Sequence, residues 1–178
     1  DGRVALTYFG EGASNQGQVF ESLNLAALFK LPCIFIIENN KYGMGTSVER
    51  ASASRDLSQN GAAWGIPGEQ VNGMDVASVR EAGERAVAHC RAGKGPYLLE
   101  MKTYRYRGHS MSDPAKYRTR EEVQKMRETS DCIETARKAL LDDFGVTEAD
   151  LKVIDDEVKA IVQDSADFAQ ESPEPPES

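Results

Sequence analysis

The sequence predicts an α/β fold, a three-layer, doubly wound, mostly parallel sheet followed by a helical carboxy-terminal extension. Three apolar runs, residues 4–9, 33–37 and 96–101, are continuous rather than alternating, which is typical of parallel strands covered on both faces. Segments with a helical repeat of apolar residues lie between these runs and after them. Strands and helices that alternate in this way favour a doubly wound sheet.

Residues 4–37 are predicted to form a strand, a helix and a second strand. Between the two strands, apolar residues recur at helical spacing from Gln18 to Phe29. A second helix is expected from Val76 to about Arg91, because Asp75 can cap its start and Gly93 can end it. The third strand follows it directly.

The pattern changes after Tyr104, where basic residues surround Gly108 and Pro114 without a period of two or 3.6. This segment is predicted to be a basic loop. Helices are expected to return over residues 120–129, 131–143 and 147–170, the last of them opened by Thr147. We therefore expect a diphosphate- and magnesium-binding α/β domain over residues 1–128, and a helical extension with an acidic tail over residues 129–178.

Length and charge narrow the class of protein. The 178 residues suffice for one domain with a real core, but the chain enters a strand at once and is expected to lack a preceding segment. The net charge of −8 is concentrated in residues 142–178, where Lys152 and Lys159 stand against 12 acidic residues. A nucleic acid is therefore a poor partner.

No run approaches the roughly 18 apolar residues of a membrane span, so no membrane association is expected.

The cysteines indicate a reducing compartment. Cys33, Cys90 and Cys132 are odd in number and lack the paired spacing of a zinc site. Reduced thiols in a cytoplasmic or matrix-like compartment are expected rather than disulfides.

Two polar turns follow the first two strands and form the candidate site. In a parallel sheet, ligands bind beyond the carboxyl ends of the strands, where Glu11 and Asn40 would both lie. If the strands are neighbours, the carboxylate and the carboxamide oxygen can share one cation, and hard oxygen ligands suit Mg²⁺. Gly12 and Ala13 leave the backbone open to a phosphate.

Other interpretations of these turns stay open. Each turn taken singly is more typical of an ordinary loop. Asn15 stands where the dinucleotide fingerprint needs its third glycine, and a P-loop lysine is missing, so ordinary nucleotide binding is disfavoured. His109 could donate to a phosphate oxygen or carry a proton near neutral pH, or could be a solvent-exposed loop residue.

Three motifs in order resemble a known family. The segments Gly10–Gly17, Glu38–Thr46 and Tyr104–Pro114 are similar to those of thiamine diphosphate-dependent 2-oxo acid dehydrogenases, and most similar to alpha subunits of the pyruvate dehydrogenase type. The resemblance runs from Arg3 to about Pro176. It implies the thiamine diphosphate-binding fold.

The resemblance also implies roles for single residues. The magnesium ligands would be the side chains of Glu11 and Asn40 and the backbone carbonyl of Tyr42. The diphosphate would be held by Gly10, Gly12, Ala13 and His109, and His109 would also help shape the reaction site as the catalytic residue. In mitochondrial members serines matching Ser110 and Ser47 are phosphorylated. A further family serine is replaced by the stretch 115–117, which indicates a bacterial-type, cytoplasmic protein, with the mitochondrial matrix as the alternative.

The implied activity is decarboxylation of pyruvate, the product of glycolysis, with thiamine diphosphate and Mg²⁺, and transfer of the acetyl group to a lipoyl domain. The implied partners are a beta subunit, the lipoyl-bearing acyltransferase component and a missing amino-terminal half of the alpha subunit, in an assembly of two alpha and two beta chains. This piece alone would be inactive. Glutamate at position 11 is familiar in the branched-chain branch, so a branched-chain 2-oxo acid or acetoin dehydrogenase is the alternative. A non-catalytic assembly module is the alternative of another class.

Overall fold

The computed structural model describes residues 2–176. Along the chain the elements are β1 (Ala5–Gly10), η1 (Ala13–Asn15), α1 (Gly17–Leu28), β2 (Cys33–Asn39), β3 (Tyr42–Gly43), β4 (Thr46–Ser47), α2 (Val48–Ala51), η2 (Leu57–Trp64), β5 (Gly68–Asn72), α3 (Val76–Arg91), β6 (Tyr97–Lys102), α4 (Arg120–Ser130), α5 (Cys132–Asp143) and α6 (Glu148–Glu171). The chain divides into two compact units, Asp1–Cys132 and Ile133–Ser178. Each unit is described by itself.

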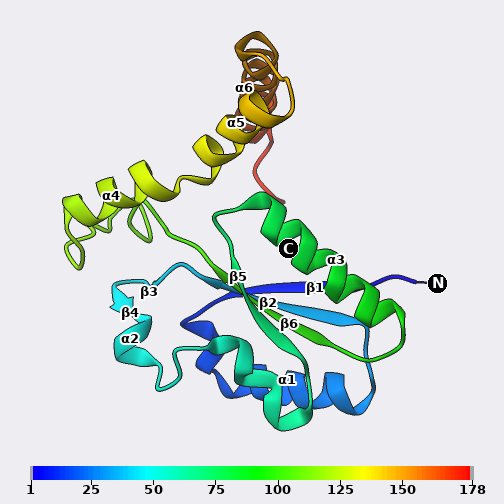
Figure 1. The fold of residues 1–178 in the computed structure, drawn as a ribbon. Coiled ribbons are helices and arrows are strands. Elements are labelled where there is room, and N and C mark those ends of the chain that lie inside the picture. Colours follow the sequence, from blue (N-terminus) through cyan, green and yellow to red (C-terminus); the bar gives the residue numbers. More distant parts are fainter. Residues whose placement is uncertain (1, 177–178) are drawn as a thin grey trace. The chain divides into compact units, whose positions relative to one another are not determined.

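A four-stranded parallel sheet organises the first unit, with strand order β1-β2-β6-β5 (Figure 1). The three predicted strands are all present. β5 was not predicted, because its sequence Gly-Glu-Gln-Val-Asn holds a single apolar residue. This strand is defined by its ladder with β6 rather than by its own pattern.

Helical layers cover both faces of the sheet, which confirms the predicted three-layer α/β fold (Figure 1). On one face, α1 and η2 pack against the sheet through Leu23, Ala26, Phe35, Ile37, Leu57, Ile66 and Leu98. On the other face, α3 packs against it through Ile34, Ile36, Val71, Ala82, Ala86, Cys90, Leu99 and Met101. Successive residues of β2 and β6 enter opposite cores, as the two-residue period of a strand requires.

β1 differs from the prediction that it is covered on both faces. It lies at the edge of the sheet, and the side chains of Leu6 and Tyr8 are 52% and 59% exposed. An apolar run shows that a strand can be buried, but whether a neighbour is there to bury it depends on the rest of the sheet.

The helix ends follow the predicted capping residues. Asp75 accepts a hydrogen bond from the backbone N–H of Ala77 at 3.0 Å, and Gly93 adopts a left-handed backbone with φ of +70° after α3. In the second unit, Thr147 and Asp150 form a reciprocal capping box at the start of α6.

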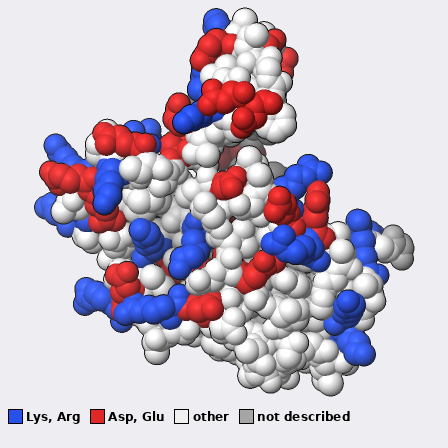
Figure 2. Space-filling model, in the orientation of Figure 1, with Lys and Arg blue, Asp and Glu red and all other residues white. Residues whose placement is uncertain are grey.

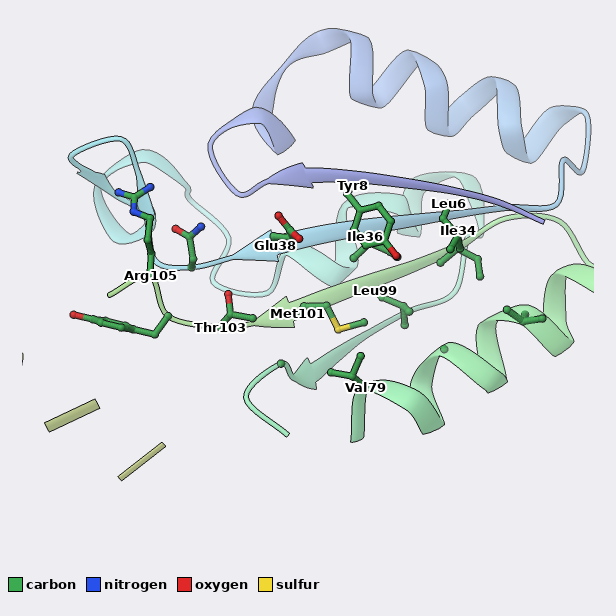
Figure 3. A pocket seen from close by; sticks show the side chains of 15 residues that line it. Leu6, Tyr8, Ile34, Ile36, Glu38, Val79, Leu99, Met101, Thr103 and Arg105 are labelled. Atoms are coloured by element: carbon green, nitrogen blue, oxygen red, sulfur yellow. The ribbon is translucent and has the colours of Figure 1, made fainter. Parts of the chain in front are cut away.

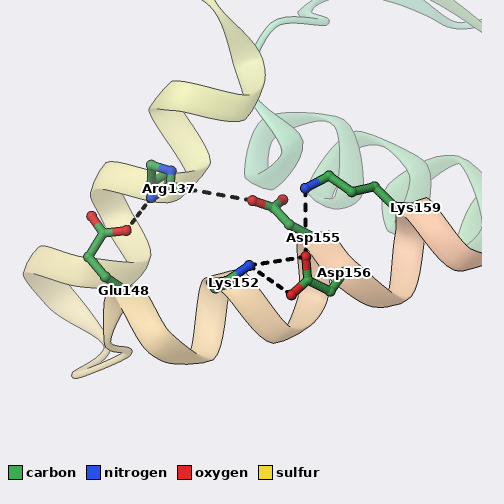
Figure 4. Close-up of polar contacts among 6 residues, drawn as sticks. All are labelled: Arg137, Glu148, Lys152, Asp155, Asp156 and Lys159. Atoms are coloured by element: carbon green, nitrogen blue, oxygen red, sulfur yellow. Dashed lines mark hydrogen bonds and ion pairs between the residues drawn. The ribbon is translucent and has the colours of Figure 1, made fainter.

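Ion pairs link α5 to α6 in the second unit and also form within α6 (Figure 4). Arg137 of α5 contacts Glu148 and also Asp155 of α6, the latter at 3.7 Å. Within α6, Lys152 lies 2.9 Å from Asp156. These pairs are exposed or, at Arg137, partly exposed, so each contributes little to stability.

Charged side chains of both signs are interspersed on the face drawn in Figure 2. In the described part of the chain, no helix is both long enough and apolar enough to span a bilayer.

Candidate functional site

A cavity of about 460 Å³ opens in the first unit where β1 and β2 end. It is lined by Gly10, Glu11, Gly12, Ala13, Gln16, Asn40, Tyr42, Gly43, Met44, Arg105 and His109. All seven residues that the sequence singled out for the site are among them. The parallel ladder pairs Gly10 with Glu38, which brings the two polar turns together at one edge of the sheet.

Glu11 and Asn40 meet across this gap. The Glu11 side chain is only 3% exposed, and its Oε2 accepts a hydrogen bond from the backbone N–H of Asn40 at 3.1 Å. Among the described residues no cationic side chain pairs with Glu11. A buried carboxylate without a cation is costly, so the site is suited to a positive ion.

The carboxamide of Asn40 supports the same interpretation. Its Oδ1 is buried and accepts no hydrogen bond from any described residue. Buried polar atoms in proteins are almost always paired, and an oxygen left over calls for an explanation such as an ion or a water. Together with Glu11 it provides two hard oxygen donors of the kind that Mg²⁺ prefers.

The two turns touch through their glycines. A Cβ on Gly43 would lie 3.4 Å from the Cα of Gly12 and 3.7 Å from Oε1 of Glu11. Larger residues would therefore occupy the space beside the carboxylate. The N-cap of α1, Gln16, makes no side-chain capping hydrogen bond, so the first N–H groups of this 12-residue helix are not capped by that side chain.

A chain of hydrogen bonds fixes the His109 loop beside the cavity. Arg105 donates to the carbonyl of Met44 at 2.7 Å and to the Tyr117 hydroxyl at 3.0 Å. That hydroxyl donates to Asp113 at 2.8 Å, and Asp113 accepts from the backbone N–H of His109 at 2.7 Å. The His109 side chain stays exposed at the mouth of the cavity.

The Asp113 carboxylate is the acceptor at the centre of this loop. Hydrogen bonds from the backbone N–H groups of His109 and Ala115, and then from the Tyr117 hydroxyl, lower its pKa below the ordinary value. A Cβ on Gly108 would lie 2.5 Å from the carbonyl oxygen of Asp113, so the loop also requires glycine there. Ser110 is exposed, with its hydroxyl 3.1 Å from that of Ser112.

An aromatic cluster behind the site ties it to α4. Tyr104 donates its hydroxyl proton to Glu122 at 2.8 Å, and the guanidinium of Arg118 lies 5.3 Å from the ring centroid of Tyr104. Burial, and then the hydrogen bond to Glu122, raise the pKa of Tyr104 to about 12. The same guanidinium lies 5.9 Å from the ring of Tyr42, which lines the cavity.

A second cavity, of about 480 Å³, lies between the sheet and α3 (Figure 3). Its walls are mainly apolar, with Leu6 of β1, Ile36 of β2 and Val79 of α3 facing one another. It shares Asn40 and Arg105 with the first cavity.

Sequence reasoning missed two buried polar residues beneath the site. Asn39 is 5% exposed and Glu100 is fully buried, and they are joined by a hydrogen bond of 2.6 Å. The available signal was an acidic residue within the otherwise apolar run 96–101.

The described residues contain no cluster of three or more His, Cys, Asp and Glu side chains able to bind a metal. A cation at this edge would therefore need amide, carbonyl or phosphate oxygens as well.

Comparison with known proteins gives one consistent family. The family model described as "Dehydrogenase E1 component" matches residues 1–178. The chain is 65% identical over 97% of its length to a pyruvate dehydrogenase E1 component subunit alpha of Rhizobium meliloti, of which it covers 49%. It is 55% identical over 98% of its length to the protein of that name from Zymomonas mobilis, of which it also covers 49%. A human relative, the somatic mitochondrial form, is 56% identical over 97% of this chain and is covered to 44%. The chain thus spans about half the length of these relatives.

Proposed function

Because this chain belongs to the dehydrogenase E1 component family, we propose that it forms part of the alpha subunit of a pyruvate dehydrogenase (acetyl-transferring). The whole enzyme would decarboxylate pyruvate and pass the acetyl group to a lipoyl domain. This part would hold the diphosphate of thiamine diphosphate and its Mg²⁺. The names of the relatives, which specify pyruvate, support this substrate over a branched-chain 2-oxo acid or acetoin.

The observation that carries the proposal is the meeting of Glu11 and Asn40, with a buried carboxylate that lacks a cationic partner and a buried amide oxygen that lacks a donor. These two side chains and the backbone carbonyl of Tyr42 would ligate the metal. The backbone of Gly10, Gly12 and Ala13 would face the diphosphate. When bound, the cofactor supplies the electron sink that decarboxylation requires.

His109 would contact the diphosphate and border the reaction site. Its place at the mouth of the cavity supports this role, because the Arg105–Tyr117–Asp113 chain holds its backbone there. The proposed partners are the remainder of the alpha subunit, a beta subunit in an assembly of two alpha and two beta chains, and a lipoyl-bearing acyltransferase. The bacterial relatives favour a cytoplasmic location.

Cofactor binding by the reassembled enzyme tests the proposal. We expect Glu11→Gln, in the full-length alpha subunit with its beta subunit, to weaken Mg²⁺-dependent thiamine diphosphate binding about tenfold or more in calorimetry, because a ligand charge is lost. The matched control Glu49→Gln removes an exposed acid of α2 outside the cavity and should bind as the parent does.

Two outcomes would contradict the proposal. Equal affinity of the Glu11→Gln and Glu49→Gln variants for thiamine diphosphate would contradict the proposed metal site. Absence of thiamine diphosphate binding in the parent enzyme would favour a non-catalytic assembly module. Substrate choice has its own test. Faster decarboxylation of 3-methyl-2-oxobutanoate than of pyruvate would replace the pyruvate assignment by a branched-chain one.

A further inference from the structure

Glu100 is a buried carboxylate that the proposed reaction does not use. It lies in β6 with no exposed surface, on the sheet face covered by α1 and η2. Its oxygens accept hydrogen bonds from Asn39 Nδ2 at 2.6 Å, Leu57 N at 2.9 Å, Ser58 N at 3.2 Å and Gln70 Nε2 at 2.8 Å. Among the described residues no Lys, Arg or His forms an ion pair with it. A buried anion held only by neutral donors is costly.

The geometry gives this anion a task at the neighbouring turn. Its Oε1 binds the amide nitrogen of Asn39, and the amide oxygen of Asn39 in turn accepts the backbone N–H of Lys41 at 3.2 Å. Lys41 has a left-handed backbone with φ of +76°, which is unfavourable for a residue with a side chain. The two hydrogen bonds of Asn39 hold the turn in that conformation.

Asn40 lies between the two residues that this arrangement fixes. Its backbone N–H reaches Glu11, and its Oδ1 is the buried oxygen without a donor. The direction of the Asn40 side chain therefore depends on the turn that Asn39 stabilises, and the orientation of the Asn39 amide depends on an acceptor at Glu100.

We propose that Glu100 is a positioning residue for the cation site, acting through the Asn39 carboxamide to hold Asn40 in its ligating orientation. The inference rests on the proposed function, since it assumes that Asn40 binds the cation. Groups behind metal ligands commonly change metal affinity by about 10–100-fold when they are replaced.

Replacement of Glu100 by glutamine separates the acceptor role from size. A glutamine has one acceptor oxygen and one donor group, so it cannot accept from Asn39 and from the η2 backbone together. If its nitrogen faces Asn39, that residue must either lose the contact or rotate its amide and give up the N–H of Lys41. Both results loosen the turn at Asn40.

The experiment uses the full-length alpha subunit reassembled with its beta subunit. Mn²⁺ is titrated at a fixed concentration of thiamine diphosphate, and free Mn²⁺ is read from its electron paramagnetic resonance signal. We expect about 10–100-fold weaker Mn²⁺ binding for Glu100→Gln. The control Gln70→Met removes a donor from the other oxygen of the same carboxylate and leaves Asn39 in place, so its Mn²⁺ affinity should match the parent. Equal losses in both variants would indicate general loosening and overturn the proposal.

A double-variant cycle tests whether the effect passes through Asn39. Asn39→Ala should weaken Mn²⁺ binding, and adding Glu100→Gln to it should weaken binding no further. Additive losses would overturn the proposal, as would parent-like binding by Asn39→Ala, which also decides the matter if Glu100→Gln does not fold. Parent enzyme that binds no Mn²⁺ would overturn the proposed function and this inference with it. Parent enzyme that binds while Glu100→Gln binds equally well would overturn this inference alone.

Discussion

Gly68 stands where the backbone of β5 passes directly against η2. A Cβ at this position would lie 2.0 Å from the carbonyl oxygen of Ser58. Ordinary contacts between heavy atoms begin at about 3.4 Å, so the change Gly68→Ala forces the two backbone segments apart by more than about 1 Å. The obstacle is backbone on both sides, and rotation of a side chain cannot relieve it.

The backbone that must move includes donors to Glu100. The N–H groups of Leu57 and Ser58 lie 2.9 and 3.2 Å from its Oε2, and a shift of this size takes both beyond hydrogen-bonding distance. A hydrogen bond to a charged group contributes about 1.5–3 kcal/mol, so the expected loss is about 3–6 kcal/mol. This is a large part of the roughly 5–15 kcal/mol by which a typical domain is stable.

Urea unfolding of the full-length subunit, followed by circular dichroism, measures this loss. Gly83→Ala is the matched control, because its Cβ in α3 would meet no atom within 4 Å. It should raise the free energy of unfolding by up to about 1 kcal/mol through helix propensity. If Gly68→Ala and the parent unfold at the same urea concentration, the close approach of Gly68 to Ser58 is wrong.

Three further changes have defined outcomes. Thr147→Ala removes the N-cap of α6 and should lower the free energy of unfolding by about 1 kcal/mol. The control Thr129→Ala, near the end of α4, should lower it by less than about 0.5 kcal/mol. Equal effects of the two changes in thermal melts would contradict the capping box. Asp113→Asn should speed hydrogen exchange at the His109 amide, because the carboxylate that accepts from this N–H is removed. In the parent, the protection of this amide is present above the ordinary pKa of an aspartate and is lost only as the pH falls through the lowered pKa of Asp113. The same pH dependence of exchange in variant and parent would contradict the hydrogen bond from His109 to Asp113. Burial raises the pKa of both Tyr104 and Tyr106 to about 12, so the contribution of Tyr104 to stability should decline as the pH rises from about 10 to 12. Tyr104→Phe should reduce the amplitude of the late step in the ultraviolet titration and leave the part due to Tyr106, and an undiminished amplitude would contradict the buried hydrogen bond from Tyr104 to Glu122.

The position of the site could be predicted because it depends on a regular feature of the fold. Parallel neighbours end at the same edge of a sheet, so the polar turns after 4–9 and 33–37 had to meet if the two strands were adjacent. The ladder between β1 and β2 makes them adjacent. The resemblance supplied the His109 loop, which no periodic pattern would have connected to this edge. Which residues bind the metal and the diphosphate stays a prediction.

The supporting network could not be predicted in the same way. An acid at position 100 of an apolar run is visible in the sequence, but its donors come from positions 39, 57, 58 and 70. These contacts depend on β5 and η2, and neither element has a clear apolar period. The domain boundary expected near residue 128 stays a prediction, and the structure forms two compact units, Asp1–Cys132 and Ile133–Ser178.

The open side of β1 has a practical consequence for anyone who prepares this polypeptide by itself. Among the described strands its hydrogen-bonding partner is β2 alone, which leaves a row of amide and carbonyl groups with Leu6 and Tyr8 projecting beside them. An exposed edge strand of this kind can pair with a strand from another molecule and start aggregation. We expect residues 1–178 in isolation to self-associate at high concentration, so titrations that test the proposed metal site are best done on the full-length alpha subunit with its proposed beta subunit.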